Sequence, residues 1–379
     1  MLSDFVPAFM QESLGSPMLM GLVMAFSSLI GFGADLLFPQ LLRGVGVKKL
    51  LFFAIVVGGL FASTLLLSTL RPYIVVFLVA MALWGVYYEF LGFANQQFVA
   101  ETAPVHDRAK VWAVMGVFRN LAYLLGPLLG GWLVGFGNNV VVGVSGGITL
   151  VAMLMIFFSR MGKREAVLEP THINLGMEIA HWKTLLVHVW PIIVMSLVIG
   201  LVDATYWTTG TVFNDMLAKN AWYGGFFLSV FTLPSLFVGL LVAKWGIYKG
   251  KKKWGERFML LSGLVLSMMG MFDNTLWYLA VVFISSCLLS VAIPLIDAVY
   301  SDVIARMGHE RKHMVGLSSS TVSLAYIIGP IIAGWISSLV GERQTFVVMG
   351  MLLAVVATVL LLITPKKLRL PQVEMASWE

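Results

Sequence analysis

Five ionisable side chains lie inside long apolar stretches of the sequence and are the first candidates for chemistry: Asp35, Glu89, Arg119, Asp203 and Asp297. A charged group in such surroundings costs several kcal/mol unless it is paired or faces water, so each residue is a candidate site. A carboxylate in this position can bind a cation or exchange a proton near neutral pH. We therefore expect the acids to mark a wet path through an apolar molecule.

Glu89 is the best candidate for a proton or cation site, because the aromatic residues Trp84, Tyr87 and Tyr88 precede it closely. Asp203 is followed by aromatic residues, and Asp297 follows a proline. The alternative for Glu89 is a structural hydrogen bond to a neighbouring helix. The candidate substrate- and ion-binding residues are Glu89, Asp203, Asp297, Tyr88, Trp84, Tyr206 and Trp207.

Residues for other kinds of chemistry are missing from the sequence. None of the six histidines has metal-ligand spacing, and the single cysteine, Cys287, excludes a disulfide framework and a cysteine-based metal site. No phosphate loop, nucleophile elbow or pair of catalytic acids is present. We expect no cofactor and no bound metal, and an enzyme is a distant alternative.

The composition places the candidate residues in a membrane protein. The 379 residues are 59% hydrophobic and 12% charged, with a mean hydropathy of +0.91. A helix crosses the hydrocarbon layer with about 20 mostly apolar residues, and the 37 glycines suit close helix packing in lipid. The sequence predicts an all-α polytopic fold with eleven spans, near 17–42, 50–70, 74–100, 111–134, 140–159, 186–212, 221–243, 258–272, 277–303, 314–340 and 344–364.

Lysine and arginine predict the topology, because cytoplasmic loops retain them. Alternate loops and the C-terminal tail hold 21 of the 25 basic residues. The 43–49 loop and the C-terminus are therefore expected in the cytoplasm, and the chain in a bacterial inner (cytoplasmic) membrane. The net charge of +6 follows from this topology and does not require a nucleic-acid partner.

The same charge pattern places two of the buried groups at a similar depth. Asp35 lies eight residues before Arg43, and Arg119 lies nine residues after Lys110, so both are roughly 12 to 14 Å from the cytoplasmic face. They could form a switchable ion pair or a fixed structural bridge. The ion-pair and gating candidates are Asp35, Arg119, Arg43, Lys48 and Lys49.

An internal repeat predicts two related helix bundles. NLAYLLGPLLGGWL at 120–133 recurs as SLAYIIGPIIAGWI at 323–336, an offset of 203. We expect an N-terminal bundle of five spans over 1–159, a cytoplasmic linker over 160–183 and a C-terminal bundle of six spans over 184–379 with a short cytoplasmic tail. The counterpart of the first helix is mostly missing, which indicates either a truncated or mis-started twelve-helix protein or a natural eleven-span form.

Two bundles, a basic central loop and a glycine-proline helix in each bundle resemble the major facilitator superfamily over essentially the whole chain. Helix five carries Gly126, Pro127, Gly130 and Gly131, which resemble the G-P-x-x-G-G element of exporters in this family. Its repeat carries Gly329, Pro330 and Gly334, with Ala333 before the last glycine. Such stretches can act as bends where the bundles meet, or serve generic packing.

Other positions match the family only in part. In the loop that usually reads G-x-L-x-D-R-x-G-R-K, Gly46, Lys48 and Lys49 fit, but Arg43 stands at the aspartate. Tyr88 stands where exporters carry a helix-four arginine, which weakens proton-coupled drug export.

The resemblance implies a secondary transporter that works by alternating access, as a monomer, with a coupling ion such as H+. It places Glu89, Asp203 and Asp297 on helices that line the central cavity. Acids outnumber buried arginine there, which favours cationic or neutral small-molecule substrates. Export of amphiphilic compounds narrowly leads uptake of a sugar or other polar metabolite, and a non-transporting relative is a further alternative.

Overall fold

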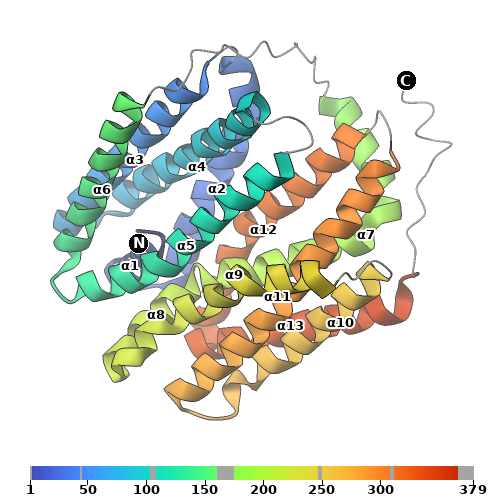
Figure 1. The fold of residues 1–379 in the computed structure, drawn as a ribbon. Helices are drawn as coiled ribbons and strands as arrows, with labels where there is room; N and C mark the ends of the chain where they lie inside the picture. The colour runs from blue at the N-terminus through green and yellow to red at the C-terminus, as the bar shows by residue number, and fades with distance from the viewer. Residues whose placement is uncertain are drawn as a thin grey trace.

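The computed structural model describes residues 2–42, 45–102, 108–159, 175–245, 250–307 and 311–365, and within these ranges all regular structure is helical (Figure 1). The first part of the chain forms α1 (Leu2–Leu14), α2 (Pro17–Leu41), α3 (Val47–Leu70), α4 (Ile74–Thr102), α5 (Arg108–Val134) and α6 (Asn138–Phe158). The second part forms α7 (Leu175–Tyr206), α8 (Thr209–Asn220), η1 (Trp222–Phe226), α9 (Phe227–Trp245), α10 (Lys251–Ser267), η2 (Met268–Gly270), α11 (Thr275–Ala305), α12 (Arg311–Val340) and α13 (Glu342–Ile363).

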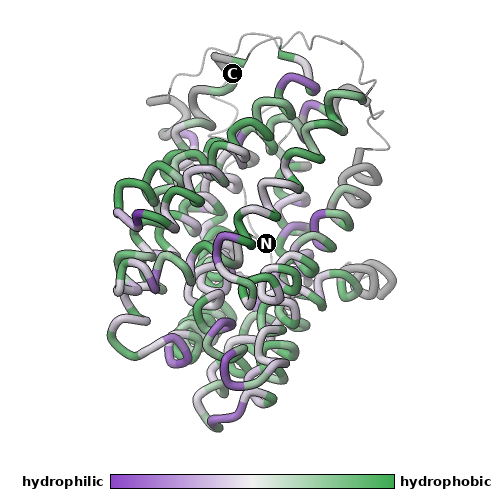
Figure 2. The backbone as a smooth tube through the Cα atoms, turned by 90° about the vertical axis from the view of Figure 1, so that its left-hand side faces the viewer, coloured by the Kyte–Doolittle hydropathy of each residue, from purple (hydrophilic) through white to green (hydrophobic). Residues whose placement is uncertain are grey.

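Nine helical stretches of the described chain are long and apolar enough to cross a membrane. Figure 2 shows hydrophobic positions over most of the length of the helices and few strongly hydrophilic ones. The spans expected near 221–243 and 258–272 are helical but shorter. A 3-10 turn precedes α9, and α10 has 17 residues of which the first three are lysines.

The helices pack as two groups, with α1 to α6 in one group and α7 to α13 in the other. Within the first group α3 packs on α4 and α6, and within the second α10 packs on α11 and α13 while α12 packs on α7. The groups meet where α2 crosses α12, α5 crosses α9 and α1 packs on α8. Each group buries its own apolar core, centred on residues such as Phe61 and Phe77 in one and Phe227 and Phe346 in the other.

The sixth membrane stretch, Ala180–Asn220, is interrupted. The α7 helix ends at Tyr206, and α8 begins at Thr209 after Thr208 adopts φ −120° and ψ −88°. The freed polar groups are bonded locally, because the Thr208 hydroxyl donates to the Ala204 carbonyl at 2.7 Å and the Thr211 hydroxyl donates to the Thr208 carbonyl at 2.7 Å. Interrupted membrane helices are tolerated where the backbone is buried or lines a cavity.

The short helix α1 corresponds to α8 in the repeat, since an offset of 203 carries residues 2–14 to 205–217. The two helices pack directly on one another. The Gln11 side-chain amide also donates to Glu342 Oε1 at 2.7 Å, which links α1 to α13 of the other group. This end of the molecule, opposite to the ends of α2, α6 and α13, is called the outer end below.

Candidate functional site

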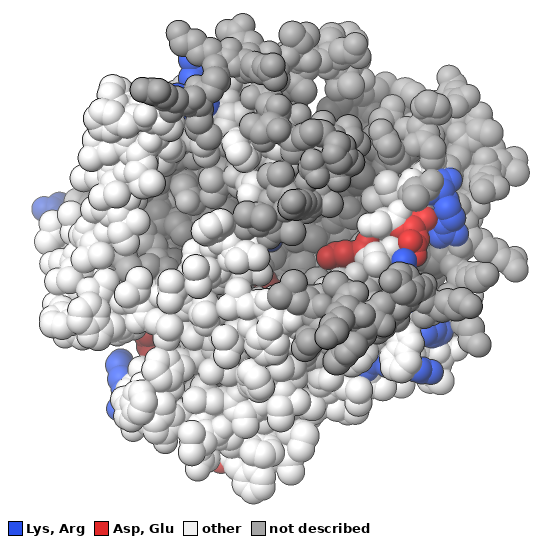
Figure 3. Space-filling model, viewed as in Figure 1, with Lys and Arg blue, Asp and Glu red and all other residues white. Residues whose placement is uncertain are grey.

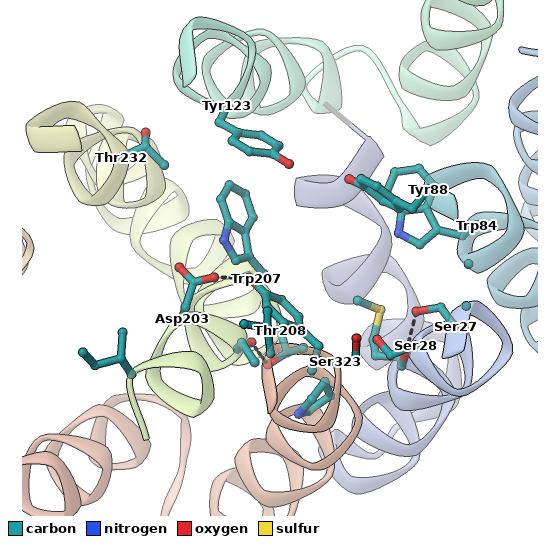
Figure 4. Close-up of a pocket in the computed structure, with 18 of the residues that line it drawn as sticks. Ser27, Ser28, Trp84, Tyr88, Tyr123, Asp203, Trp207, Thr208, Thr232 and Ser323 are labelled. Carbon is teal, nitrogen blue, oxygen red and sulfur yellow. Dashed lines mark hydrogen bonds between the residues drawn. The ribbon is translucent and has the colours of Figure 1, made fainter. Parts of the chain in front are cut away.

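A cavity of about 480 Å³ lies between the two groups of helices. Residues of α1, α2, α4 and α5 form one side, and residues of α7, α9, α11 and α12 form the other. Its position follows from the fold, because the helices that cross between the groups also supply its walls. Figure 4 shows side chains from both groups converging on this space.

Asp203 reaches the cavity from α7, one turn before the helix break. Its carboxylate accepts hydrogen bonds from the Tyr326 hydroxyl of α12 and from the Trp207 side chain. Two neutral donors therefore hold the carboxylate, and the described residues that line the cavity include no lysine or arginine. Such a carboxylate can accept a proton or the cationic group of a ligand.

Glu89 reaches the cavity from α4 on the opposite group. A Cβ atom placed on Gly31 of α2 would lie 3.0 Å from Glu89 Oε1, so this carboxylate packs against bare backbone. The approach of the two helices depends on Gly85, where a Cβ atom would overlap the Ser27 carbonyl oxygen. Two glycines thus bring Glu89 to the α2 wall.

Aromatic side chains connect the two acidic walls. Trp84 and Tyr88 stack edge to face with ring centroids 5.0 Å apart, and Tyr88 is hydrogen-bonded to Tyr123 of α5. The ring centroids of Tyr123 and Trp207 are 5.4 Å apart, and the Trp207 side chain is hydrogen-bonded to Asp203. These contacts therefore cross from one group of helices to the other (Figure 4). Aromatic faces suit flat or cationic organic ligands.

Hydroxyl groups complete the lining, with Ser27, Ser28, Thr208, Thr232 and Ser323 among them (Figure 4). They can donate or accept hydrogen bonds with little directional demand. A mainly apolar cavity with a few polar groups is the usual form of a small-molecule site.

Two other candidates do not line the cavity. Asp297 is exposed on α11, but it follows the lining residues Ser286, Ser290 and Ile293 on the same helix face, one turn farther from the outer end. Tyr206 is fully buried in the second group, where its ring stacks on Phe231 with a centroid distance of 3.7 Å.

The ion-pair candidates are only partly described. The side chains of Asp35 and Arg43 lie outside the described residues, so their predicted contacts stay predictions. Arg119 is exposed on α5 and is not among the described lining residues. Lys49 is exposed, whereas Lys48 Nζ donates to the carbonyls of Phe157 and Ser159 at 3.0 and 2.8 Å and so caps the end of α6.

The glycine-proline stretches lie differently in the two repeats. Gly126, Pro127 and Gly130 are buried on α5, while Gly131 has no heavy atom within 4 Å of the position of a Cβ. On α12, Gly329 faces Ala204 of α7, and Pro330 and Gly334 face α2 of the other group. The glycine-proline stretch of α12 therefore contacts the other group of helices at Gly334, whereas the stretch of α5 makes no such contact at the equivalent Gly131.

Sequence reasoning missed two cavity tyrosines that the repeat itself marks. Tyr123 and Tyr326 are the tyrosines of NLAY and SLAY, at the same repeat position, and both line the cavity. Their equal position before each glycine-proline pair was the available signal.

A buried charge cluster was missed as well. Glu256 of α10 is fully buried, where Lys252 Nζ lies 2.8 Å from Oε1 and Lys253 Nζ lies 3.0 Å from Oε2. The Thr364 hydroxyl donates to Glu256 Oε1 at 2.8 Å, and Lys253 donates to the Leu361 carbonyl at 2.9 Å. An offset of 204 relates Lys48 and Lys49 to Lys252 and Lys253, and the end of the last helix is bound by Lys48 in the first group and by the lysine pair in the second.

An all-helical membrane fold with a cavity between two helix groups is the arrangement found in secondary transporters. The chain matches the family described as Major Facilitator Superfamily over residues 1–309 and 251–377, and it belongs to this family. It is an integral membrane protein that moves a small molecule across the membrane by alternating access.

Two similar proteins are drug-resistance proteins by name. The quinolone resistance protein NorA of Staphylococcus aureus is 24% identical over 277 residues, which cover 69% of this chain and 67% of that protein. The multidrug resistance protein 2 of Bacillus subtilis is 23% identical over 298 residues, which cover 76% of this chain and 72% of that protein.

Solved structures share the fold. A peptide transporter POT in complex with sulfate matches with a TM-score of 0.71 and 14% identity over 92% of this chain and 85% of that chain. A proton-dependent oligopeptide transporter matches with a TM-score of 0.68 and 12% identity over 94% and 92% of the two chains.

Proposed function

We propose that this transporter exports amphiphilic cationic or neutral compounds from the cytoplasm in exchange for protons. The observation that carries the proposal is the lining of the cavity, which combines two carboxylates with aromatic rings and hydroxyls and has no lysine or arginine among its described residues. An aromatic amphiphile buries its rings against Trp84, Tyr88 and Trp207, and its cationic group approaches a carboxylate. The names of the two resistance proteins support this direction and substrate class.

Glu89 and Asp203 are the proposed exchange sites, one on each group of helices. A proton arriving at a carboxylate neutralises it and releases a cationic substrate, and loss of the proton restores the charge that attracts the next one. The Trp207 and Tyr326 donors hold the Asp203 carboxylate in place while it changes occupant. A fixed structural hydrogen bond remains the alternative role for Glu89.

The two groups of helices correspond to the moving bodies of the transport cycle in this proposal. Residues 1–159 and 184–379 rock about the cavity, and residues 160–183 join them in the cytoplasm. The 43–49 loop and the C-terminus lie on the cytoplasmic side of a bacterial cytoplasmic membrane, in accordance with the distribution of lysine and arginine. One chain encloses the cavity, which supports a monomer as the working unit.

The test measures substrate-driven proton movement in proteoliposomes with a cationic aromatic dye and a neutral amphiphile as substrates. Asp203→Asn and Glu89→Gln should each abolish or strongly reduce proton-driven accumulation of the dye. Glu12→Gln is the matched control, because Glu12 is an exposed acid on α1 that does not line the cavity. Dye transport with unchanged proton dependence in Asp203→Asn and Glu89→Gln would remove both residues from the coupling role.

A further inference from the structure

The outer end of the molecule contains a close crossing between α2 and α12, which lie side by side at the centre of Figure 1. A Cβ atom on Gly21 of α2 would overlap the Pro330 carbonyl oxygen of α12. A Cβ atom on Gly334 of α12 would overlap the Pro17 carbonyl oxygen of α2. Each helix therefore presents a glycine to a proline carbonyl of the other, and we call these four residues the glycine seam.

The seam joins the two groups of helices at one end of the cavity. Pro330 lines the cavity and also contacts Gly21, whereas Gly334 and Pro17 continue the crossing toward the outer end. Pro17 is the first residue of α2, and Gly334 lies six residues before the end of α12. Passage from the cavity to the outer end must therefore separate the groups at this crossing or beside it.

The repeat-related crossing of α5 and α9 has no such seam. Gly131, the counterpart of Gly334, has no heavy atom within 4 Å of the position of a Cβ. Gly224, the counterpart of Gly21, faces the Leu217 carbonyl within its own group. The described polar contact between α5 and α9 is a hydrogen bond of 3.3 Å from the Ser229 hydroxyl to the Leu124 carbonyl.

We propose that Gly21 and Gly334 are positioning residues of transport, because the glycine seam holds the outer ends of the two groups together and so sets the balance between the two open states. The proposal rests on the proposed rocking of the groups. Cβ contacts under 3.0 Å essentially do not occur in proteins, so one added methyl group forces the two backbones apart. The strain falls on the state with the outer end closed and is absent when the outer ends are separated. The added methyl therefore favours the outward-open state.

The experiment compares Gly334→Ala with Gly131→Ala, two identical changes at equivalent repeat positions, of which only the first meets backbone of the other group. The pair Gly21→Ala and Gly33→Ala provides the same comparison on α2, because nothing lies within 4 Å of a Cβ on Gly33. All variants carry Cys287→Ser and a reporter, Ser28→Cys, in the cavity lining. A membrane-impermeant maleimide is applied to intact cells and to inverted vesicles, without substrate.

The expected result is a rise of about tenfold in the labelling rate from the outside of cells for Gly334→Ala and Gly21→Ala, with a fall in inverted vesicles. Gly131→Ala and Gly33→Ala should label like the parent protein. Equal labelling of Gly334→Ala and Gly131→Ala would overturn the proposal. Because labelling needs no substrate or proton gradient, this result stands apart from a failure of the export proposal.

A second measurement applies if the alanine variants do not fold. Gln11 and Glu342, which are hydrogen-bonded across the groups at the outer end, are both replaced by cysteine, and the glycine seam is left unchanged. In protein that lacks the Ser28→Cys reporter, a short bifunctional methanethiosulfonate should join them and stop transport until a reductant is added. Transport that continues after complete cross-linking would refute the idea that separation at this end is required.

Discussion

Replacement of Glu256 by glutamine should destabilise the protein more than any other single charge removal in the first two turns of α10. Glu256 is fully buried, and the side chain of Lys252 is 3% exposed, so their ion pair of 2.8 Å is closed off from water. The variant leaves two ammonium groups, those of Lys252 and Lys253, with carbonyl and hydroxyl partners but no carboxylate. Removal of one partner from a buried pair costs about 3–5 kcal/mol, because the other charge stays buried and uncompensated.

Asp302→Asn is the matched control on the neighbouring lysine. Lys251 Nζ lies 2.7 Å from Asp302 Oδ2, but the Asp302 side chain is 55% exposed, and such a pair contributes about 0–1 kcal/mol. Figure 3 shows acidic and basic side chains in contact on an otherwise largely uncharged described surface. The midpoint temperature of thermal unfolding in detergent should therefore fall by about 5 °C or more for Glu256→Gln and by about 1 °C or less for Asp302→Asn.

A double variant separates charge from packing. Lys252→Met combined with Glu256→Met should be more stable than Glu256→Met alone, because only Lys253 then lacks its carboxylate partner, whereas Glu256→Met leaves both lysines without one. Equal losses for Glu256→Gln and Asp302→Asn, or a double variant no more stable than Glu256→Met alone, would refute the electrostatic reasoning.

Gly31→Ala should reduce transport of a cationic dye severalfold without a loss of folding, because the new Cβ lies 3.0 Å from Glu89 Oε1 and displaces the carboxylate. Gly33→Ala should transport the dye normally, because nothing lies within 4 Å of its Cβ. Equal transport rates in the two variants would contradict the role of Gly31 in placing Glu89. Lys48→Met should lower the free energy of unfolding by about 1–2 kcal/mol because it removes the charged cap of α6. Lys49→Met is the control, because Lys49 is exposed, and it should change the free energy of unfolding by less than about 0.5 kcal/mol. Similar losses of stability in both variants, measured by thermal unfolding, would argue against the role of Lys48 as a cap.

The candidate site was predictable where a residue's chemistry conflicts with its surroundings. Glu89 and Asp203 are carboxylates within apolar stretches, and the cost of burying charge is a property that sequence reveals without coordinates. Asp297 shows the limit of that argument, because its position along α11 places it one turn beyond the cavity lining. Tyr123 and Tyr326 carry no such conflict, and only their equivalence in the repeat marked them.

The contacts between helices could not be predicted from the chemistry of single residues. Lys252, Lys253 and Glu256 are spaced for helical pairing, but their burial depends on the end of α13, more than a hundred residues away. The reciprocal approach of Gly21 and Gly334 depends on the register and rotation of α2 against α12, which the repeat does not specify because the equivalent α5 crossing lacks it.

By itself the sequence determined that this is a duplicated, all-helical membrane transporter with acids in its interior, because apolar length, charge asymmetry and repetition are written along one chain. Only the tertiary structure decided which acids share a cavity, which lysines cap helices and which glycines join the two groups. The physical reason is that the bilayer dictates each helix separately, whereas the side chains that meet are selected by how neighbouring helices rotate and cross.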